Sequence, residues 1–101
     1  MSQVKEVVVF RLKKDTNEAD FLTDAQQTFE LLQSYDGYIE RELGVSEDGT
    51  WIDIVTWADL PTALQAAENI MKSPIGQAFG HHIEPDSIQM NHVHPRISTS
   101  E

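Results

Sequence analysis

One central aspartate is the residue of this sequence whose position most demands a chemical explanation. Asp53 interrupts the otherwise apolar run from Thr50 to Trp57. A buried carboxylate is costly unless it is paired or protonated. Asp53 is therefore either half of an ion pair with Arg11 or Arg41, or an acid–base group that faces a pocket. The sequence leaves both alternatives open.

Four histidines, in two pairs, are the other candidates for chemistry. His81 and His82 are adjacent, and adjacent helical residues point about 100° apart, so one metal ion does not suit both. One of them either caps a helix C-terminus or acts as a general base in a cleft. His92 and His94 share one face of a strand, where Asp53 or His81 would have to supply a third metal ligand. The alternative is that these two histidines are solvated or interfacial, and we predict no metal site.

Aromatic and basic side chains have two interpretations each. Trp51, Trp57 and Tyr38 either stack on an aromatic ligand or pack in a core or interface. Arg41 either binds an acidic group of a substrate or forms an edge-strand salt bridge with Glu40 or with the neighbours of Glu42 across the strand. The sequence has no glycine-rich phosphate loop and no nucleophile elbow.

The composition limits the classes of function. The chain has 101 residues, which is one domain, and its formal net charge is −10. That charge repels phosphate backbones, so we expect no nucleic-acid partner. There is no cysteine, no signal-peptide pattern and no apolar run long enough to span a membrane. We therefore expect a cytoplasmic protein that does not bind membranes.

The hydrophobic pattern predicts alternating strands and helices. Four strands are expected, at Val4–Leu12, Tyr38–Ser46, Thr50–Trp57 and Ser87–His94. Helices are expected from Asn17 to Tyr35, after Asp59, and after the Ser73-Pro74 break. Their buried stripes are predicted to be Phe21, Leu22, Ala25, Phe29 and Leu32 in the first helix and Leu64, Ala67, Ile70 and Met71 in the second.

The turns complete this pattern. Gly37 suits a left-handed position after the first helix, and Asp48-Gly49 predicts a type I′ hairpin. Residues 1–95 then form one domain, and residues 96–101 a disordered tail.

The element order is β-α-β-β-α-β, which predicts an α+β, ferredoxin-like fold with a four-stranded antiparallel sheet. Right-handed crossovers place the first and third strands in the centre. Both central strands carry apolar residues on both faces, whereas the helices cover one face only. A second copy of the chain is the simplest cover for the other face, so we predict a homodimer, a dimeric α/β barrel.

Residues spread along the chain resemble the dimeric α/β-barrel superfamily, and within it the antibiotic-biosynthesis-monooxygenase-like family. They are Gly37-Tyr38, Arg41-Glu42-Leu43, Trp57, Asp59, Ala63 and Ser73-Pro74. The resemblance covers Val4 to about His94. It implies a cofactor-less monooxygenase that acts on a small aromatic or quinol-type molecule.

Three positions depart from the pattern of that family. Some relatives carry histidine or tryptophan where this chain has Ile70. Haem-degrading relatives carry asparagine where it has Phe10 and a histidine near Gly80. The departures disfavour haem or metal binding, which is the third hypothesis, and we expect no cofactor. A non-catalytic small-molecule-binding homodimer is the second hypothesis.

The resemblance and the residues together give the candidate site. The expected catalytic residues are Asp53, His81 and His82. The expected lining of the ligand pocket is Phe10, Trp57, Ile70, Phe79 and His92.

Overall fold

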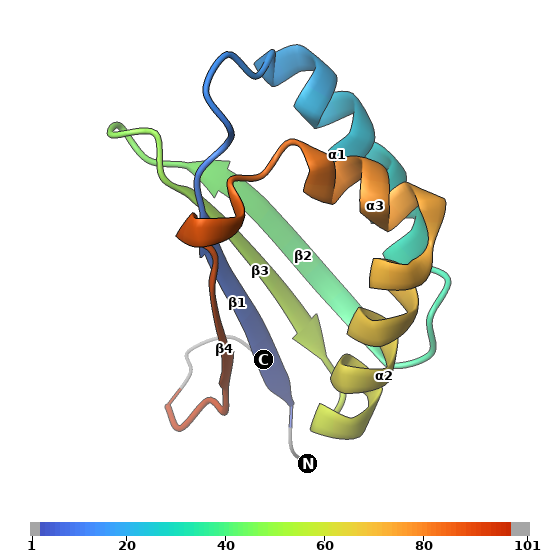
Figure 1. Ribbon diagram of the computed structural model, residues 1–101. Helices are drawn as coiled ribbons and strands as arrows, with labels where there is room; N and C mark the ends of the chain where they lie inside the picture. Colours follow the sequence, from blue (N-terminus) through green and yellow to red (C-terminus); the bar gives the residue numbers. More distant parts are fainter. Residues whose placement is uncertain (1–2, 98–101) are drawn as a thin grey trace.

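The four strands form one antiparallel sheet, and the helices cover one of its faces (Figure 1). The computed structural model describes residues 3–97. The elements are β1 (Val4–Phe10), α1 (Glu18–Leu32), β2 (Tyr38–Val45), β3 (Trp51–Trp57), α2 (Leu60–Lys72), α3 (Pro74–His81), the 3-10 turn η1 (Pro85–Ser87) and β4 (Gln89–Val93). The sheet order β2-β3-β1-β4 confirms the predicted ferredoxin-like fold with the first and third strands in the centre.

Three side chains begin the helices where the sequence predicts. Asn17, Asp59 and Ser73 each accept a hydrogen bond from a backbone N–H in the first turn, at 3.0, 2.9 and 3.0 Å. These caps satisfy donors that the helix itself leaves unpaired. Strand and helix ends are shorter than expected by one to three residues. In particular, Ser87 belongs to η1 rather than to β4.

The hairpin between β2 and β3 differs from the expected type I′ turn. Gly49 has a positive φ of 88°, but Asp15 is the one non-glycine residue with positive φ within residues 3–97. Asp48 is therefore in ordinary backbone geometry. Gly49 N–H donates to the Ser46 carbonyl at 3.0 Å, and Asp48 instead accepts from Thr50 N–H and the Ser46 hydroxyl. These side-chain bonds hold the longer loop and lower the pKa of Asp48 to about 2.

The buried stripe of α2 is also different from the prediction. Leu64 and Met71 are 50% and 72% exposed, whereas Ala63 and Ala66 are buried. Small side chains let the helix axis lie close to the sheet, so the alanines and not the larger residues make the contact. In α1, Leu22 is exposed, and the buried residues are Phe21, Ala25, Thr28 and Leu32.

Two clusters of buried side chains join the helices to the sheet. One contains Val4, Leu32, Val55, Trp57, Ala63 and Ala66, and the other contains Phe10, Phe21, Trp51 and Ile83. They are centred on different ends of the central strands, and the space between them is not filled by either cluster.

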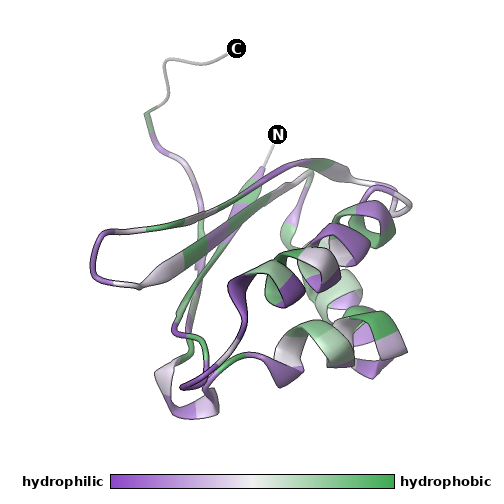
Figure 2. Ribbon diagram, turned by 90° about the horizontal axis from the view of Figure 1, so that it is seen from above, coloured by the Kyte–Doolittle hydropathy of each residue, from purple (hydrophilic) through white to green (hydrophobic). Residues whose placement is uncertain are grey.

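The opposite face of the sheet has no helix on it within residues 3–97 (Figure 2). Its central apolar side chains alternate with the buried ones along β1 and β3. They are Val7, Val9, Ile52 and Ile54. No helix of the described chain is long and apolar enough to cross a membrane. Of the predicted tail, residues 98–101 lie outside the described residues.

The corner between α2 and α3 depends on a close backbone approach at Gly76. A Cβ atom there would overlap the backbone carbonyl of Ile70, whereas a Cβ atom at Gly80 would meet nothing within 4 Å. Gly76 lets the first turn of α3 pass directly over the last turn of α2.

We predict that Gly76→Ala destabilises the protein by about 1–3 kcal/mol, because the corner must open to admit a methyl group. Gly80→Ala is the matched control, and it should be neutral or stabilising by up to about 1 kcal/mol, because alanine favours a helix. Urea unfolding of both variants measures the difference. Equal effects of the two substitutions would contradict the close approach.

Candidate active site

A cavity of about 220 Å³ lies between the helices and the sheet. Its wall is mostly apolar, and every strand and α-helix contributes residues to it. The apolar part includes Phe10, Leu32, Ile70, Phe79 and Met90. Four polar side chains also reach the wall, from Glu6, Thr28, Arg41 and Asp53. An apolar cavity with a few convergent polar groups is the usual form of a small-molecule site.

The strand register places the polar groups in a row across the sheet. Arg41 on β2 is opposite Val55 on β3, Val55 is opposite Glu6 on β1, and Glu6 is opposite His92 on β4. We call Arg41, Val55, Glu6 and His92 the transverse row. Directly opposite residues share a face of the sheet, and Glu6, Arg41 and Val55 are buried on the helix side. Charged groups thus flank a central valine.

Arg41 and Asp53 form a buried, bidentate ion pair. Arg41 Nε donates to Asp53 Oδ1 at 2.9 Å, and Nη2 donates to Oδ2 at 2.7 Å. Nη1 donates to the hydroxyl of Thr28 at 2.7 Å. This confirms the ion-pair interpretation of Asp53 with Arg41 as its partner.

The same pair corrects two other expectations. Arg41 forms a salt bridge from the edge strand as expected, but its partner is Asp53 on β3 and not Glu40, because the guanidinium turns into the interior. Arg11 was the other expected partner of Asp53. It pairs with Asp48 in the hairpin instead, where its Nη2 atom lies 3.6 Å from Asp48 Oδ2.

Two aromatic rings flank the Arg41 guanidinium. Its central carbon lies 4.9 Å from the ring centre of Phe29 and 5.5 Å from that of Phe79. Aromatic faces attract a desolvated cation. The rings, Thr28 and Asp53 therefore fix the guanidinium in one position. A guanidinium has five N–H donors, so two remain beyond those that bond Asp53 and Thr28.

Glu6 is a second buried carboxyl group, on the central strand β1. It is 8% exposed. Trp57 Nε1 donates to Glu6 Oε1 at 3.4 Å. Burial raises the pKa of Glu6 above its ordinary value of 4.5, against the smaller opposing effects of the Trp57 hydrogen bond and of His92. A buried carboxyl group with a raised pKa is a candidate for proton transfer.

The predicted site residues fall into two groups. Asp53, Phe10, Ile70 and Phe79 line the cavity. Trp57 does not line it but holds Glu6 through its indole N–H. His92 stands beside Glu6 in the transverse row, half-buried, and its Nε2 atom is buried without a hydrogen-bond partner.

The other two predicted catalytic residues lie away from the cavity. His82 Nε2 is 2.7 Å from Asp24 Oδ2, and the ring packs on Phe21. His82 also ends α3, and His81 is exposed beside it. The structure therefore does not bring either histidine to the wall of the cavity, and their catalytic role stays a prediction.

Tryptophan and tyrosine side chains here belong mainly to the core. Trp51 packs edge-on against Phe21 with ring centres 5.0 Å apart, and Tyr38 packs edge-on against Trp57 at 6.0 Å. Both tryptophans are at most 5% exposed. These contacts favour packing over stacking on a ligand.

Glu6 is the site residue that the sequence reasoning missed. A signal was present: Glu6 shares the parity of Val4 and Phe10, which are the buried side of β1. Like Asp53, Glu6 is a carboxylate on the buried face of a central strand, and such a residue demands a chemical explanation.

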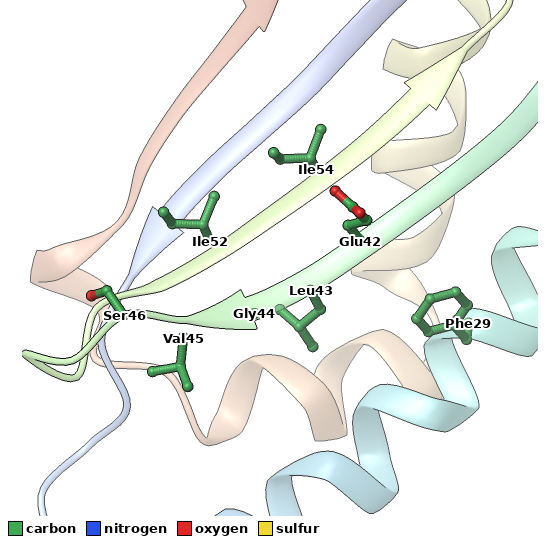
Figure 3. A pocket seen from close by; sticks show the side chains of 8 residues that line it. All are labelled: Phe29, Glu42, Leu43, Gly44, Val45, Ser46, Ile52 and Ile54. Carbon is green, nitrogen blue, oxygen red and sulfur yellow. The ribbon is translucent and has the colours of Figure 1, made fainter. Parts of the chain in front are cut away.

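A shallow groove follows the free edge of β2 and is distinct from the cavity (Figure 3). Leu43 and Val45 point toward the helices, whereas Ile52 and Ile54 lie on the open face of the sheet. Glu42 is exposed there. Without a buried titratable group, the groove offers apolar surface rather than chemistry.

The residues of the cavity do not fit a haem. Phe10, Ile70 and Gly80 all line the cavity but offer no ligand to a haem iron. No histidine within residues 3–97 lines it, and 220 Å³ is small for a macrocycle. No cluster of three or more metal-ligating side chains occurs in the described part of the chain.

The fold and cavity define a ferredoxin-like α+β protein with one small, partly polar interior site. No known family model matches the sequence, and no curated protein does either. The structure does match known solved structures. A point mutant of SnoaB, a cofactor-independent oxygenase from Streptomyces nogalater, superposes with a TM-score of 0.84 at 16% identity over 100% of both chains.

Two further structures share the fold. A protein from Bordetella bronchiseptica, provisionally named an antibiotic biosynthesis monooxygenase, matches with a TM-score of 0.76 at 16% identity, over 96% of this chain and 100% of that one. A dimeric ferredoxin-like protein of unknown function from Jannaschia sp. CCS1 matches with a TM-score of 0.68 at 12% identity, over 90% and 97%. These matches confirm the predicted ferredoxin-like fold.

We predict that the stability gained by Glu6→Gln grows with pH. Because the folded pKa of Glu6 lies above 4.5, the native state holds this proton more tightly than the unfolded chain does. Its contribution to stability is full below about pH 4.5 and is lost as pH rises through the folded pKa. Glutamine keeps the shape and stays neutral.

Urea unfolding of the wild type and Glu6→Gln between about pH 4 and pH 8 tests this. Glu40→Gln, at an exposed site on β2, is the control, with no trend expected. A difference between Glu6→Gln and the wild type that is constant across this range would contradict the buried, proton-holding carboxyl group.

Proposed function

We propose that this protein is a cofactor-independent monooxygenase that acts on a one- or two-ring quinol-type molecule bound in the interior cavity. The observation that carries the proposal is the Glu6 carboxyl group, buried in the wall of an otherwise largely apolar cavity. The likeness in fold to SnoaB supports the reaction class.

The size of the cavity favours a small ligand. A dry apolar cavity of about 150 Å³ accepts a benzene ring, so 220 Å³ suits one ring or two fused rings. Phe10 and Phe79 offer aromatic contacts. The polar groups of the transverse row then favour oxygen atoms at opposite ends of the ring system, which is the pattern of a quinol.

In this proposal, Glu6 and Arg41 bind different oxygen atoms of the ligand. Glu6, as the carboxylate, takes a proton from one ring hydroxyl. The two free N–H groups of Arg41 donate to the other oxygen. A dry pocket that ionises the ring makes it a strong electron donor to oxygen.

The reaction balances without a cofactor. One atom of O₂ becomes a new ring hydroxyl and the other leaves as water. The quinol becomes a hydroxyquinone and supplies all four electrons. The proton that Glu6 takes returns to the reduced oxygen that forms water.

The test is oxygen uptake with 1,4-dihydroxynaphthalene, corrected for its spontaneous oxidation, with 1,4-dimethoxynaphthalene as the substrate that has no ionisable hydroxyl. We expect uptake with the first compound only, and a loss of about 10²–10⁴-fold in Glu6→Gln, the usual contribution of a general base. Glu40→Gln should keep the full rate.

Uptake at the same rate in Glu6→Gln would contradict the role of Glu6. No catalysed uptake with any one- or two-ring quinol, while those compounds still bind, would favour a non-catalytic small-molecule-binding dimer. That second function has its own support, because Phe10 and Ile70 put apolar side chains in the cavity where relatives carry functional ones.

A homodimer through the open face of the sheet belongs to the proposal. Val9 and Ile54 are half-buried there, and Ile52 is 38% exposed. Contiguous apolar surface of this kind marks an interaction site, and the two-fold pairing of identical faces is the commonest cover. The dimeric neighbour of the same fold supports it. A cytoplasmic location without nucleic-acid partners is part of the same proposal, and the excess of acidic residues supports the absence of nucleic-acid partners.

We predict that light scattering after size exclusion gives the mass of two chains at micromolar concentration. Ile52→Lys should give one chain, because it places a charge in the centre of the buried face. Leu64→Lys, at an exposed position on α2, should remain dimeric. A wild type with the mass of a single chain would contradict the dimer.

A further inference from the structure

His92, at the β4 end of the transverse row, has a buried ring nitrogen, Nε2, without a hydrogen-bond partner within residues 3–97. An unsatisfied buried nitrogen costs free energy and calls for an explanation. His92 is half-buried on β4, an edge strand, so its ring reaches from the interior toward the surface.

The acceptor or donor that this nitrogen lacks stands directly opposite on the next strand. Glu6 and His92 are register partners in the antiparallel pair of β1 and β4, where Cβ atoms lie about 4.5–5.5 Å apart on the same face. One Glu6 oxygen accepts from Trp57. The other oxygen has no hydrogen-bond partner in the described chain, and a hydrogen bond between it and His92 Nε2 would satisfy both atoms.

The other charged groups near Glu6 are Arg41 and Asp53, which form an ion pair with each other. The Trp57 indole donates a hydrogen bond to Glu6 and does not titrate. The cavity wall contributed by α1 and α2 consists of Thr28, Leu32, Ala67, Ile70 and Met71, none of which titrates near neutral pH. Among the cavity's neighbours in the described chain, His92 alone can both accept the proton of Glu6 and reach toward solvent.

We propose that His92 relays protons between the Glu6 carboxyl group and the surface at the β4 edge of the sheet. A proton taken from a bound hydroxyl by the Glu6 carboxylate passes to neutral His92 Nε2, which restores the carboxylate. The resulting imidazolium gives up a proton from its other nitrogen to water, and the reverse path returns one. Because His92 acts through Glu6, it is a positioning residue and not a contact of the ligand.

This inference rests on the proposed function for its purpose, but its test does not. The experiment follows the carboxyl carbon of Glu6 by NMR in protein labelled with ¹³C at glutamate, assigned by Glu6→Gln, across a pH titration without ligand. In the wild type, the Glu6 signal should show two steps, one shared with the His92 ring, because interacting groups titrate as a pair.

His92→Gln should reduce the Glu6 signal to one step at higher pH, because the nearby imidazolium favours the carboxylate. His94→Gln, exposed two residues along the chain, is the control and should keep both steps. A Glu6 signal that titrates identically in the wild type and in His92→Gln would overturn the relay. If His92→Gln does not fold, the wild-type ring signal of His92 decides, since it must show the Glu6 step.

The catalytic readout separates the relay from the proposed function. If quinol oxidation occurs, His92→Gly should slow it, and added imidazole should restore it, which a purely structural role would not allow. Coupled titration without oxygen uptake would uphold the relay and contradict the oxygenase. Oxygen uptake with uncoupled titration would do the reverse.

Discussion

The buried pair of Arg41 and Asp53 is the interaction on which the rest of the site depends. Taking two charges out of water costs several kcal/mol each, and only near-ideal geometry repays it. Here the bidentate contact, the Thr28 hydroxyl and the Phe29 ring all act on one guanidinium. Removing one partner would leave the other charge buried alone. The pair therefore fixes β2 and β3 to α1 around a cavity that apolar side chains alone would be free to fill.

The two carboxyl groups of the interior differ because their neighbours differ. Asp53 has a cation within hydrogen-bond distance, whereas Glu6 has only an indole donor at 3.4 Å and the His92 ring beside it. Burial without a full partner is what raises the pKa of Glu6. One carboxylate is thus structural and the other is left available for proton transfer. Environments that separate two similar groups in this way are typical of acid–base sites.

Sequence patterns predicted most of the architecture and only part of the site. The apolar residues on both faces of β1 and β3, the capping side chains Asn17, Asp59 and Ser73, and the element order were sufficient for the fold. The predicted type I′ hairpin is wrong because Asp48 stabilises the loop with side-chain hydrogen bonds and does not have positive φ. The predicted α2 stripe is wrong at Leu64 and Met71 because close packing selects Ala63 and Ala66 over larger neighbours.

For the site, type and spacing identified Asp53 and its partner Arg41, and the resemblance placed Phe10 and Ile70 at the cavity. His81 and His82 were predicted to be catalytic from their residue type, but at the end of α3 the His82 ring lies against Asp24. Glu6 was hidden in a strand that looked uniformly apolar. Its importance comes from the register of four strands, which aligns Arg41, Val55, Glu6 and His92 and which no local pattern contains.

The central claim is that a small hydroxylated aromatic molecule binds inside the cavity with its hydroxyl on Glu6. A crystal structure of the protein soaked with 2-naphthol tests this most directly. We expect density for the ring beside Phe10 and Phe79, with its oxygen within about 3.2 Å of the Glu6 carboxyl group. A cavity that stays free of naphthol at saturating concentration, or a naphthol whose oxygen points away from Glu6, would contradict the account.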